Sequence, residues 1–322
     1  MYIFFLVLAI ISIGVTIIAT IQRKAWWIRI FDFPRLQIII LQLFSGIGMA
    51  FFIESFTIVN IIIAALLLVT IFIQLKYVFP YFRFAKKDIP DCNKTKSAAL
   101  SFMVSNVLQK NRQYRKLISI IKKEKPSILL LVETNHWWAE KLKQIDALYT
   151  YSVKHPLDNT YGMMLYSKFP LKNTHIDFLV KKNIPSIQTE VQVDNFKFKL
   201  ACLHPEPPAP DEAKMSRPRD RELIKMAKKI REKPIPYVVL GDLNDVPWSD
   251  TSYKFERISG LKDPRRGRGF FNTFSAQIPL LRFALDHIFF SGHFEVAAMK
   301  RLPKIGSDHF PIFISCCIRY SP

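Results

Sequence analysis

Hydrophobic residues are unevenly distributed along the chain, and this pattern predicts two parts. Three long apolar stretches fill the first part, at residues 1–22, 36–53 and 56–75. Each stretch has roughly 18–22 residues without a charged side chain, which is enough to cross about 30 Å of hydrocarbon as a helix. We therefore predict a membrane anchor of three transmembrane helices at residues 1–80. The alternative is a set of buried helices in a soluble core.

The connections between these stretches bear on topology. Only Glu54 and Ser55 separate the second stretch from the third, which predicts a tight helical hairpin. Trp26 and Trp27 lie beside basic residues, as residues at a membrane interface often do. Basic residues occur both before the second stretch and after the third, so the positive-inside rule places the following domain in the cytoplasm.

The second part of the chain reads as a soluble domain at residues 99–322, joined to the anchor by a linker at residues 81–98. Its short apolar runs predict strands, and periodic apolar positions predict helices at 113–123 and 219–231. The expected strands lie at residues 99–107, 127–132, 161–166, 187–193, 196–203, 237–240, 283–290 and 310–318. This mixture predicts an α+β fold with packed sheets and helices outside.

The charge of the chain narrows the choice of partners. The formal net charge is +20, and the eight basic and three acidic residues up to Asp88 leave +15 for the rest. Such a balance favours nucleic acid, phospholipid headgroups or a phosphorylated small molecule, although a basic surface beside an anionic membrane explains it equally well. The four cysteines form no CxxC pair or zinc spacing, and Cys316 and Cys317 are read as buried apolar residues.

Two predicted strands end on carboxylates that could hold or use a cation. Glu133 ends an apolar run, where an unpaired carboxylate would be unfavourable and a hard cation would offset the cost. Asp242 and Asn244 follow another buried strand across Gly241, which lets the backbone turn sharply and present both side chains. A surface glutamate and ordinary turn chemistry are the simpler alternatives.

Two histidines and a further aspartate also lie in or near predicted strands. Asp308 and His309 precede a short apolar strand, and an adjacent acid and histidine can supply one metal contact and one proton-transfer group. Asp286 lies within an apolar strand and could orient a histidine from elsewhere. His204 ends a further strand. A single histidine is more often structural than catalytic, so the joint pattern carries the prediction.

The order of these motifs resembles that of the endonuclease/exonuclease/phosphatase superfamily, whose members are similar to deoxyribonuclease I. The resemblance runs from about residue 99 to 317, and a membrane-anchored bacterial subgroup is most similar through residues 155–162 and 217–221. The motifs that carry the resemblance are Asn106, residues 128–133 (ILLLVE), 203–204 (LH), 241–244 (GDLN), 285–288 (LDHI) and 306–310 (GSDHF). The resemblance implies a four-layered α/β/β/α sandwich.

The resemblance also implies a role for each residue. Mg²⁺ or Mn²⁺ would be held by Glu133, with Asn106 and Asp308 close to it. Asp242 would orient or deprotonate the attacking water, and Asn244 would donate to the phosphoryl oxygens. His309 would lie beside the scissile phosphate, oriented by Asp286. A second catalytic histidine would be His204.

Substrate phosphates are expected to meet arginine and amide side chains, because the arginine fork matches phosphate oxygens. The predicted substrate-binding residues are Arg217, Arg221 and Asn159. Four further arginines are weaker candidates, for which solvated surface charge is the alternative. These are Arg219, Arg265, Arg266 and Arg268.

The sequence thus predicts an integral membrane protein of the bacterial inner membrane that hydrolyses a phosphodiester with a divalent metal. The expected partners are the bilayer and a phosphodiester substrate, either nucleic acid or a phospholipid headgroup, with no protein partner. An inactive membrane-tethered binding module is the alternative. The similar subgroup often has a basic hairpin turn and points to the periplasmic side, so the side of the membrane stays open.

Overall fold

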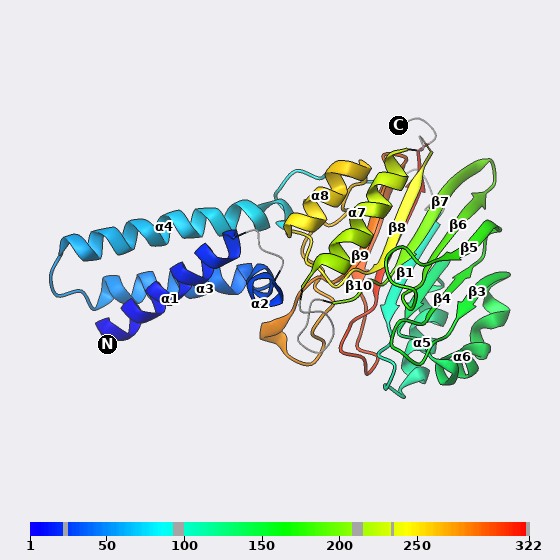
Figure 1. The fold of residues 1–322 in the computed structure, drawn as a ribbon, viewed down its shortest axis with the longest axis horizontal. Coiled ribbons are helices and arrows are strands. Elements are labelled where there is room, and N and C mark those ends of the chain that lie inside the picture. Colours follow the sequence, from blue (N-terminus) through cyan, green and yellow to red (C-terminus); the bar gives the residue numbers. More distant parts are fainter. Residues whose placement is uncertain (22–24, 93–99, 208–214, 233–234, 320–322) are drawn as a thin grey trace.

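The computed structural model describes residues 1–21, 25–92, 100–207, 215–232 and 235–319. A bundle of long helices extends from one side of a β-sandwich, and the N-terminus lies at the far end of the bundle (Figure 1). The chain therefore separates into the two parts that its hydrophobic pattern predicts.

The bundle consists of α1 (Tyr2–Thr20), α3 (Arg35–Phe51) and α4 (Ile58–Val78), with the short α2 (Trp26–Arg29) before α3. By length and composition, the segments Tyr2–Thr20 and Ile58–Tyr81 could each cross a membrane. A third span is possible only if the segments Trp26–Asp32 and Arg35–Phe51, which meet at a 70° bend, form one span. Two or three candidate spans thus precede the domain.

Polar side chains join the three helices inside the bundle. The Gln42 amide donates to the hydroxyl groups of Thr16 and Thr70, at 3.0 and 2.9 Å. Gln74 donates to the same Thr16 hydroxyl at 3.1 Å and accepts from Arg35 at 2.8 Å. Such interhelical hydrogen bonds stabilise helices whose outer faces are apolar, because lipid provides no competing partner. The outward-facing side chains of the helices are large and apolar, among them Ile40, Ile47 and Leu68.

The sandwich contains two sheets, one of six strands in the order β10-β11-β1-β2-β4-β3 and one of five in the order β5-β6-β7-β8-β9. The strands of the first sheet are β10 (Phe294–Arg301), β11 (Ile312–Ile318), β1 (Leu100–Asn106), β2 (Ile128–Val132), β4 (Met163–Ser167) and β3 (Tyr151–His155). Those of the second are β5 (Leu171–Asp177), β6 (Ser186–Val193), β7 (Phe196–Leu203), β8 (Tyr237–Asp242) and β9 (Asp286–Phe290).

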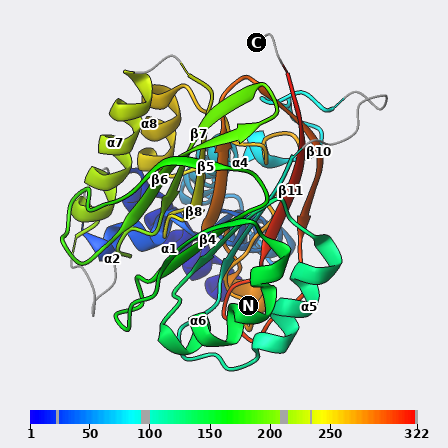
Figure 2. The same ribbon diagram turned by 90° about the vertical axis from the view of Figure 1, so that its right-hand side faces the viewer.

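Helices cover both outer faces, as Figure 2 shows from the side of the sandwich. The helices α5 (Tyr114–Glu124) and α6 (His136–Leu142) cover the first sheet. The helices α7 (Arg217–Arg231) and α8 (Asp250–Ser259) cover the second. Side chains such as Phe102, Leu130 and Phe198 fill the space between the sheets. The expected four-layered α/β/β/α sandwich is confirmed.

The segment entering the domain is joined to its last strand by a disulfide. Cys92 pairs with Cys317 of β11, with a Cα–Cα separation of 5.8 Å. Arg268 adds an ion pair to Asp91 at 2.6 Å. Cys316 is buried, as expected. The interpretation of Cys317 as a merely buried side chain is wrong, because Cys317 forms this disulfide. The sequence could not predict the bond, since nothing in the local pattern of the last strand points to Cys92.

A continuous apolar contact connects the helix bundle to the sandwich, and we call it the joint. It contains Ile39 and Val78 from the bundle, Tyr81 beyond α4, and Val246 and Trp248 of the domain. Two hydrogen bonds fix it: the Trp248 indole donates to the Asp32 carbonyl at 2.7 Å, and the Tyr81 hydroxyl donates to the Pro247 carbonyl at 3.0 Å. Because Trp248 follows Asp242 by only six residues, one edge of the sandwich faces the bundle.

Candidate active site

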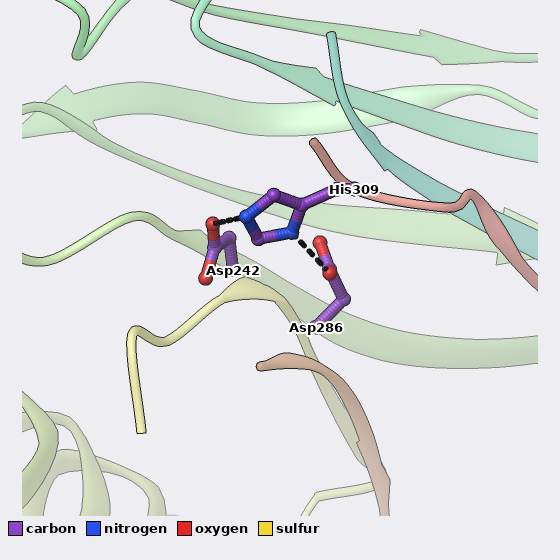
Figure 3. A group of neighbouring side chains, drawn as sticks. All are labelled: Asp242, Asp286 and His309. Carbon is purple, nitrogen blue, oxygen red and sulfur yellow. Dashed lines mark hydrogen bonds and ion pairs between the residues drawn. The ribbon is translucent and has the colours of Figure 1, made fainter. Parts of the chain in front are cut away.

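The centre of the site is His309, which lies between two carboxylates (Figure 3). Its Nδ1 is 2.8 Å from Asp286 Oδ2, and its Nε2 is 3.6 Å from Asp242 Oδ2. All three side chains are buried. Burial lowers the pKa of His309, but Asp286 and Asp242 outweigh it and raise the value to about 10. The two carboxylates therefore favour the protonated imidazole, and Asp286 holds the ring in one orientation.

The sheet topology explains why these residues meet. Asp242 is the last residue of β8 and Asp286 the first of β9, and the two are directly paired across this antiparallel ladder. His309 arrives on the segment before β11, where an isolated bridge pairs it with Phe274. Three stretches far apart in sequence thus place one side chain each at the same edge of the sandwich.

A second group of polar side chains lies beside Asp242. The Asn106 amide donates to Glu133 Oε1 at 2.7 Å and to Asp242 Oδ2 at 3.0 Å. Its Oδ1 accepts from the backbone of Leu108. Asn106 is the last residue of β1, Glu133 follows the neighbouring parallel strand β2, and Asp242 comes from the other sheet. Asn106 therefore connects the carboxylates of the two sheets and fixes their separation.

Glu133 is the residue best suited to hold a divalent cation. Burial raises its pKa to about 7, and the negative charges of Asp242 and Asp308 add to this, while hydrogen bonds from Asn106 and Gln109 oppose it. Its φ of 59° lies in the left-handed region, which non-glycine residues rarely occupy outside functional or tight-turn positions. Crowded carboxylates and amide groups fit an oxygen-seeking ion such as Mg²⁺.

A surface pocket of about 320 Å³ lies next to Glu133 and is lined by Lys110, Arg112 and Asn135 among others. Its basic rim would attract an anion toward the carboxylates, so a bound phosphate could meet both the rim and a cation at Glu133.

The loop after β8 depends on Gly241. A Cβ atom there would lie 1.8 Å from the Leu203 carbonyl oxygen, and its φ of 151° also favours glycine. Beyond it, Asp242 Oδ1 accepts from the backbone N–H of Asn244 at 3.0 Å, and the Asn244 amide donates to the Pro205 carbonyl at 3.0 Å. That bond leaves one amide proton of Asn244 for a substrate oxygen.

His204 lies on the other side of Asp242 and is also buried. Its Nε2 is 3.9 Å from Asp242 Oδ2, and its ring is 5.5 Å from the Tyr161 ring. Within the described residues its Nδ1 has no hydrogen-bond partner. Burial lowers the pKa of His204, Asp242 opposes this, and His309 adds to it. His204 is thus biased toward the neutral form, in contrast to His309.

Asp308 is half-buried and stands apart from the closest cluster. Groups of three or more possible metal ligands in the described chain include Asp242, Asp286 and His309, whose ligand atoms lie within 4.8 Å of one another. Asp308 receives a hydrogen bond from the Ser307 hydroxyl at 3.3 Å. Since Asp286 and His309 already bind each other, an ion would more readily use Glu133, whose charge interacts with Asp242 and Asp308.

The predicted substrate-binding residues make other contacts in the described chain, although Asn159 precedes Thr160, which lines the pocket beside Glu133. Arg217 and Arg221 are exposed on α7, and Arg221 lines a separate surface pocket with Ile224 and Lys225. The Asn159 amide donates to the Asn183 carbonyl and its carbonyl accepts from the backbone of Tyr161. Neither arginine has a hydrogen bond or ion pair to the His309 group in the described chain.

The other candidate arginines have structural partners. Arg219 is buried, forms an ion pair with Asp245 at 3.2 Å and donates to the Asn244 carbonyl at 2.7 Å, so it supports the loop after β8. Arg265 and Arg268 form ion pairs with Asp263 and Asp91, and Arg266 pairs with Glu256.

One segment near the site was missed by sequence reasoning. The Phe274 ring is 5.1 Å from the His309 ring, and the Ala276 N–H donates to the Asp308 carbonyl at 2.7 Å. The guanidinium groups of Arg282 and Arg301 lie over the Phe310 ring. These two arginines are closer in the fold to His309 than their sequence positions suggest, because a loop returns the chain to this edge. No local motif marks them.

Several solved structures are similar to this chain. TDP2 from D. rerio, solved with a single-strand DNA product, shares 18% identity at a TM-score of 0.58, covering 68% of this chain and 98% of that one. The human Nocturnin catalytic domain shares 18% at 0.57, with 74% and 99% covered. A Beutenbergia cavernae endonuclease/exonuclease/phosphatase shares 18% at 0.54, with 68% and 71% covered.

At this identity the solved structures show the fold alone, which is that of deoxyribonuclease I. No curated protein matches the chain. The family model described as the endonuclease/exonuclease/phosphatase family matches residues 101–309, a segment that contains all eight of the predicted catalytic and metal residues. The chain therefore belongs to the endonuclease/exonuclease/phosphatase family.

Proposed function

We propose that this protein is a membrane-anchored phosphodiesterase that depends on a divalent metal, Mg²⁺ or Mn²⁺. The observation that carries the proposal is the position of the His309 cation between Asp286 and Asp242, with the Asn106–Glu133 pair on the other side of Asp242. His309 thus lies on one side of Asp242, and the Glu133 carboxylate lies on the other side. Phosphoryl transfer needs both, because negative charge builds on the phosphoryl oxygens while water attacks in line.

Each side chain has a role that its contacts allow. A cation held at Glu133, with Asp308 close by, would neutralise charge on the phosphoryl oxygens. Asp242 would orient the attacking water and accept its proton, since burial raises the pKa of this carboxyl even though His309 opposes the shift. His309, fixed by Asp286, would hold positive charge beside the phosphate and give a proton to the leaving oxygen. Asn244 would donate its remaining amide proton to a phosphoryl oxygen.

A panel assay tests the proposal. Purified full-length protein should release product from a phosphodiester in Mg²⁺ and lose that activity in EDTA. His309→Ala should lower kcat by about 10²–10⁴-fold, because both its charge and its proton are lost. The matched control is His175→Ala, which removes an exposed histidine of β5 and should leave the rate unchanged. Wild-type turnover in His309→Ala would refute the proposal.

A loop next to the site favours a lipid substrate over nucleic acid. Residues 277–281 are exposed and include Ile278, Leu280 and Leu281. The loop is fixed to the third residue of α3, since the Gln37 amide donates to the Leu280 carbonyl at 2.8 Å. Its apolar side chains therefore lie beside the first turn of α3, which forms a candidate span only together with Trp26–Asp32, and from there they could enter the bilayer. The same loop continues from Phe274 beside His309.

The nuclease alternative is supported by the net charge of +20 and by the DNA product in the D. rerio TDP2 structure. The assay panel separates the two: phospholipid in mixed micelles, sphingomyelin, plasmid DNA and a soluble phosphomonoester. Preference for a lipid phosphodiester, reduced by Leu280→Ser with no change toward a soluble phosphoester, supports the lipid reading. Faster, salt-sensitive cleavage of DNA supports the nuclease.

We also propose that the sandwich lies on the oxidising, periplasmic side of a bacterial inner membrane. Disulfides persist in oxidising compartments and are rare in the cytosol, and the Cys92–Cys317 pair is one. Positive-inside counting of the basic residues in the connections points the other way. A protease added to intact spheroplasts should remove a C-terminal tag; a fully protected tag would place the domain in the cytoplasm.

A further inference from the structure

A cavity in the joint is lined mainly by basic side chains, whereas the active site is rich in carboxylates. It has a volume of about 380 Å³ and lies between the ends of α1 and α4 and the loop after β8. Four basic side chains line it, against two acidic ones. The basic ones are Arg29, Arg35, Lys76 and Arg266. The lining of the cavity therefore contains more basic than acidic side chains.

The arginine side chains in this cavity have hydrogen-bond donors that nothing in the described chain uses. Arg29 and Arg35 are 7% and 2% exposed; both pair with Asp32, and Arg29 Nη2 also lies 3.6 Å from Asp245 Oδ2. Within the described residues, the Nε–H groups of Arg29, Arg35 and Arg266 have no hydrogen-bond partner, and neither has Nη2 of Arg29. Buried polar groups are nearly always satisfied, so several unused donors around one cavity indicate a ligand with several acceptor oxygens.

The position of the cavity suggests where that ligand comes from. Its walls include Thr20 and Ile21 at the end of α1 and Lys76 and Tyr77 near the end of α4. Since both helices are candidate membrane spans, these ends lie at the level of the lipid headgroups if the anchor crosses the bilayer as proposed above. Lysine, arginine and tyrosine are the residues that collect at this level.

We propose that this cavity binds the phosphate of an anionic membrane lipid, a phosphomonoester or phosphodiester headgroup that neutralises Arg29, Arg35 and Lys76. The site is distinct from the catalytic group but connected to it. Asp245 Oδ2 is 3.6 Å from Arg29 and 3.2 Å from Arg219, and Arg219 in turn donates to the Asn244 carbonyl. A headgroup in the cavity would therefore stabilise the loop that presents Asp242 and Asn244.

The test is binding of short-chain phosphatidate to purified full-length protein in neutral detergent, followed by native mass spectrometry in EDTA. Arg29→Gln and Lys76→Gln should each weaken binding about tenfold or more, the loss expected for a charge-assisted hydrogen bond. Lys76 is exposed, so its variant folds even if Arg29→Gln does not. The matched control, Lys86→Gln, removes an exposed lysine outside the cavity and should bind like the wild type.

Two results would overturn the proposal. Equal affinity in the wild type and Lys76→Gln, or an equal loss in Lys86→Gln, would mean that phosphatidate binds to general surface charge or to the active site. Displacement of the lipid by inorganic phosphate at comparable concentration would assign the cavity to a soluble anion. Retained lipid binding in excess inorganic phosphate supports the headgroup site, because acyl chains against α1 and α4 add affinity that the free ion lacks.

Discussion

The catalytic edge and the joint both bury charged groups, but with opposite imbalance. At the catalytic edge Glu133, Asp242 and Asp286 outnumber His309, whereas the cavity in the joint is lined by Arg29, Arg35, Lys76 and Arg266 against Asp32 and Asp250. Buried charge without a counter-charge is unfavourable, so a ligand of opposite charge would stabilise each region. The comparison teaches that the sign of the imbalance predicts the ligand: a cation for the first region, an anion for the second.

The largest effect is expected from the substitution Asp242→Asn, which changes the catalytic edge and leaves the joint intact. It removes the carboxylate that contacts His309, His204 and Asn106, and with it the group that accepts the proton of water. We expect kcat to fall by about 10³-fold or more while Kd for a lipid in the joint is unchanged. Initial rates with saturating Mg²⁺ measure the first effect. A fall of less than tenfold would remove Asp242 from the reaction.

The second test asks whether His309 works as a cation. Because Asp286 is the strongest charge that raises its pKa to about 10, Asp286→Asn should lower that pKa. The protonated form is present below the folded pKa and is lost as pH rises through it, so the alkaline limit of kcat/KM should move to lower pH by about one unit or more. An unchanged alkaline limit with a merely lower rate would mean that Asp286 acts only on folding.

The third test concerns the divalent cation that we expect Glu133 to bind. Mg²⁺ at about a hundred times its Kd should stabilise the folded protein by about 2.7 kcal/mol, because it binds the native arrangement of Glu133. Differential scanning fluorimetry measures the shift in Tm. Glu133→Gln should abolish the shift, whereas Glu124→Gln, a change on α5 of a residue paired with Lys300, should keep it. Equal shifts in both variants would place the ion elsewhere.

The smallest effect is expected for Glu222, a buried residue that lies outside the catalytic edge and the joint. Burial raises the pKa of Glu222 in α7 to about 8, and Glu206 adds to the shift. The folded state therefore favours the protonated form, so stability is full below the ordinary glutamate pKa and falls as pH rises toward 8. Glu222→Gln should raise Tm at pH 8 by a few degrees and change it little at pH 5. The reverse pH dependence would contradict the assignment.

Much of the fold follows from hydrophobic runs, and the strands that were missed share one cause. The sequence predicts strands at residues 127–132 and 196–203, which contain β2 and β7: both faces of β2 are buried, and β7 is buried except near Lys197 and Lys199. The three missed strands, β3, β5 and β10, all lie at sheet edges. Edge strands are half exposed and rich in polar residues, so their alternation is weak.

The site divides in the same way. Asp242, Asp286 and His309 could be singled out because each interrupts an apolar pattern at a strand end. The roles of Arg219 and Arg265 could not, since an arginine that pairs with a buried carboxylate looks the same in sequence as one that binds substrate. Tertiary contacts alone separate the two. The same holds for Phe274, whose place beside His309 depends on a long loop.

The Cys92–Cys317 bond makes a closed ring of the chain between those two residues, and the whole catalytic edge lies within that ring. A single cut by a protease anywhere inside it would leave both fragments covalently attached to the helix bundle. The C-terminal fragment could not separate from the helix bundle until the bond was also reduced. The sandwich is therefore attached to the bundle by two covalent connections rather than one, and a nicked molecule would still run as one species on a non-reducing gel.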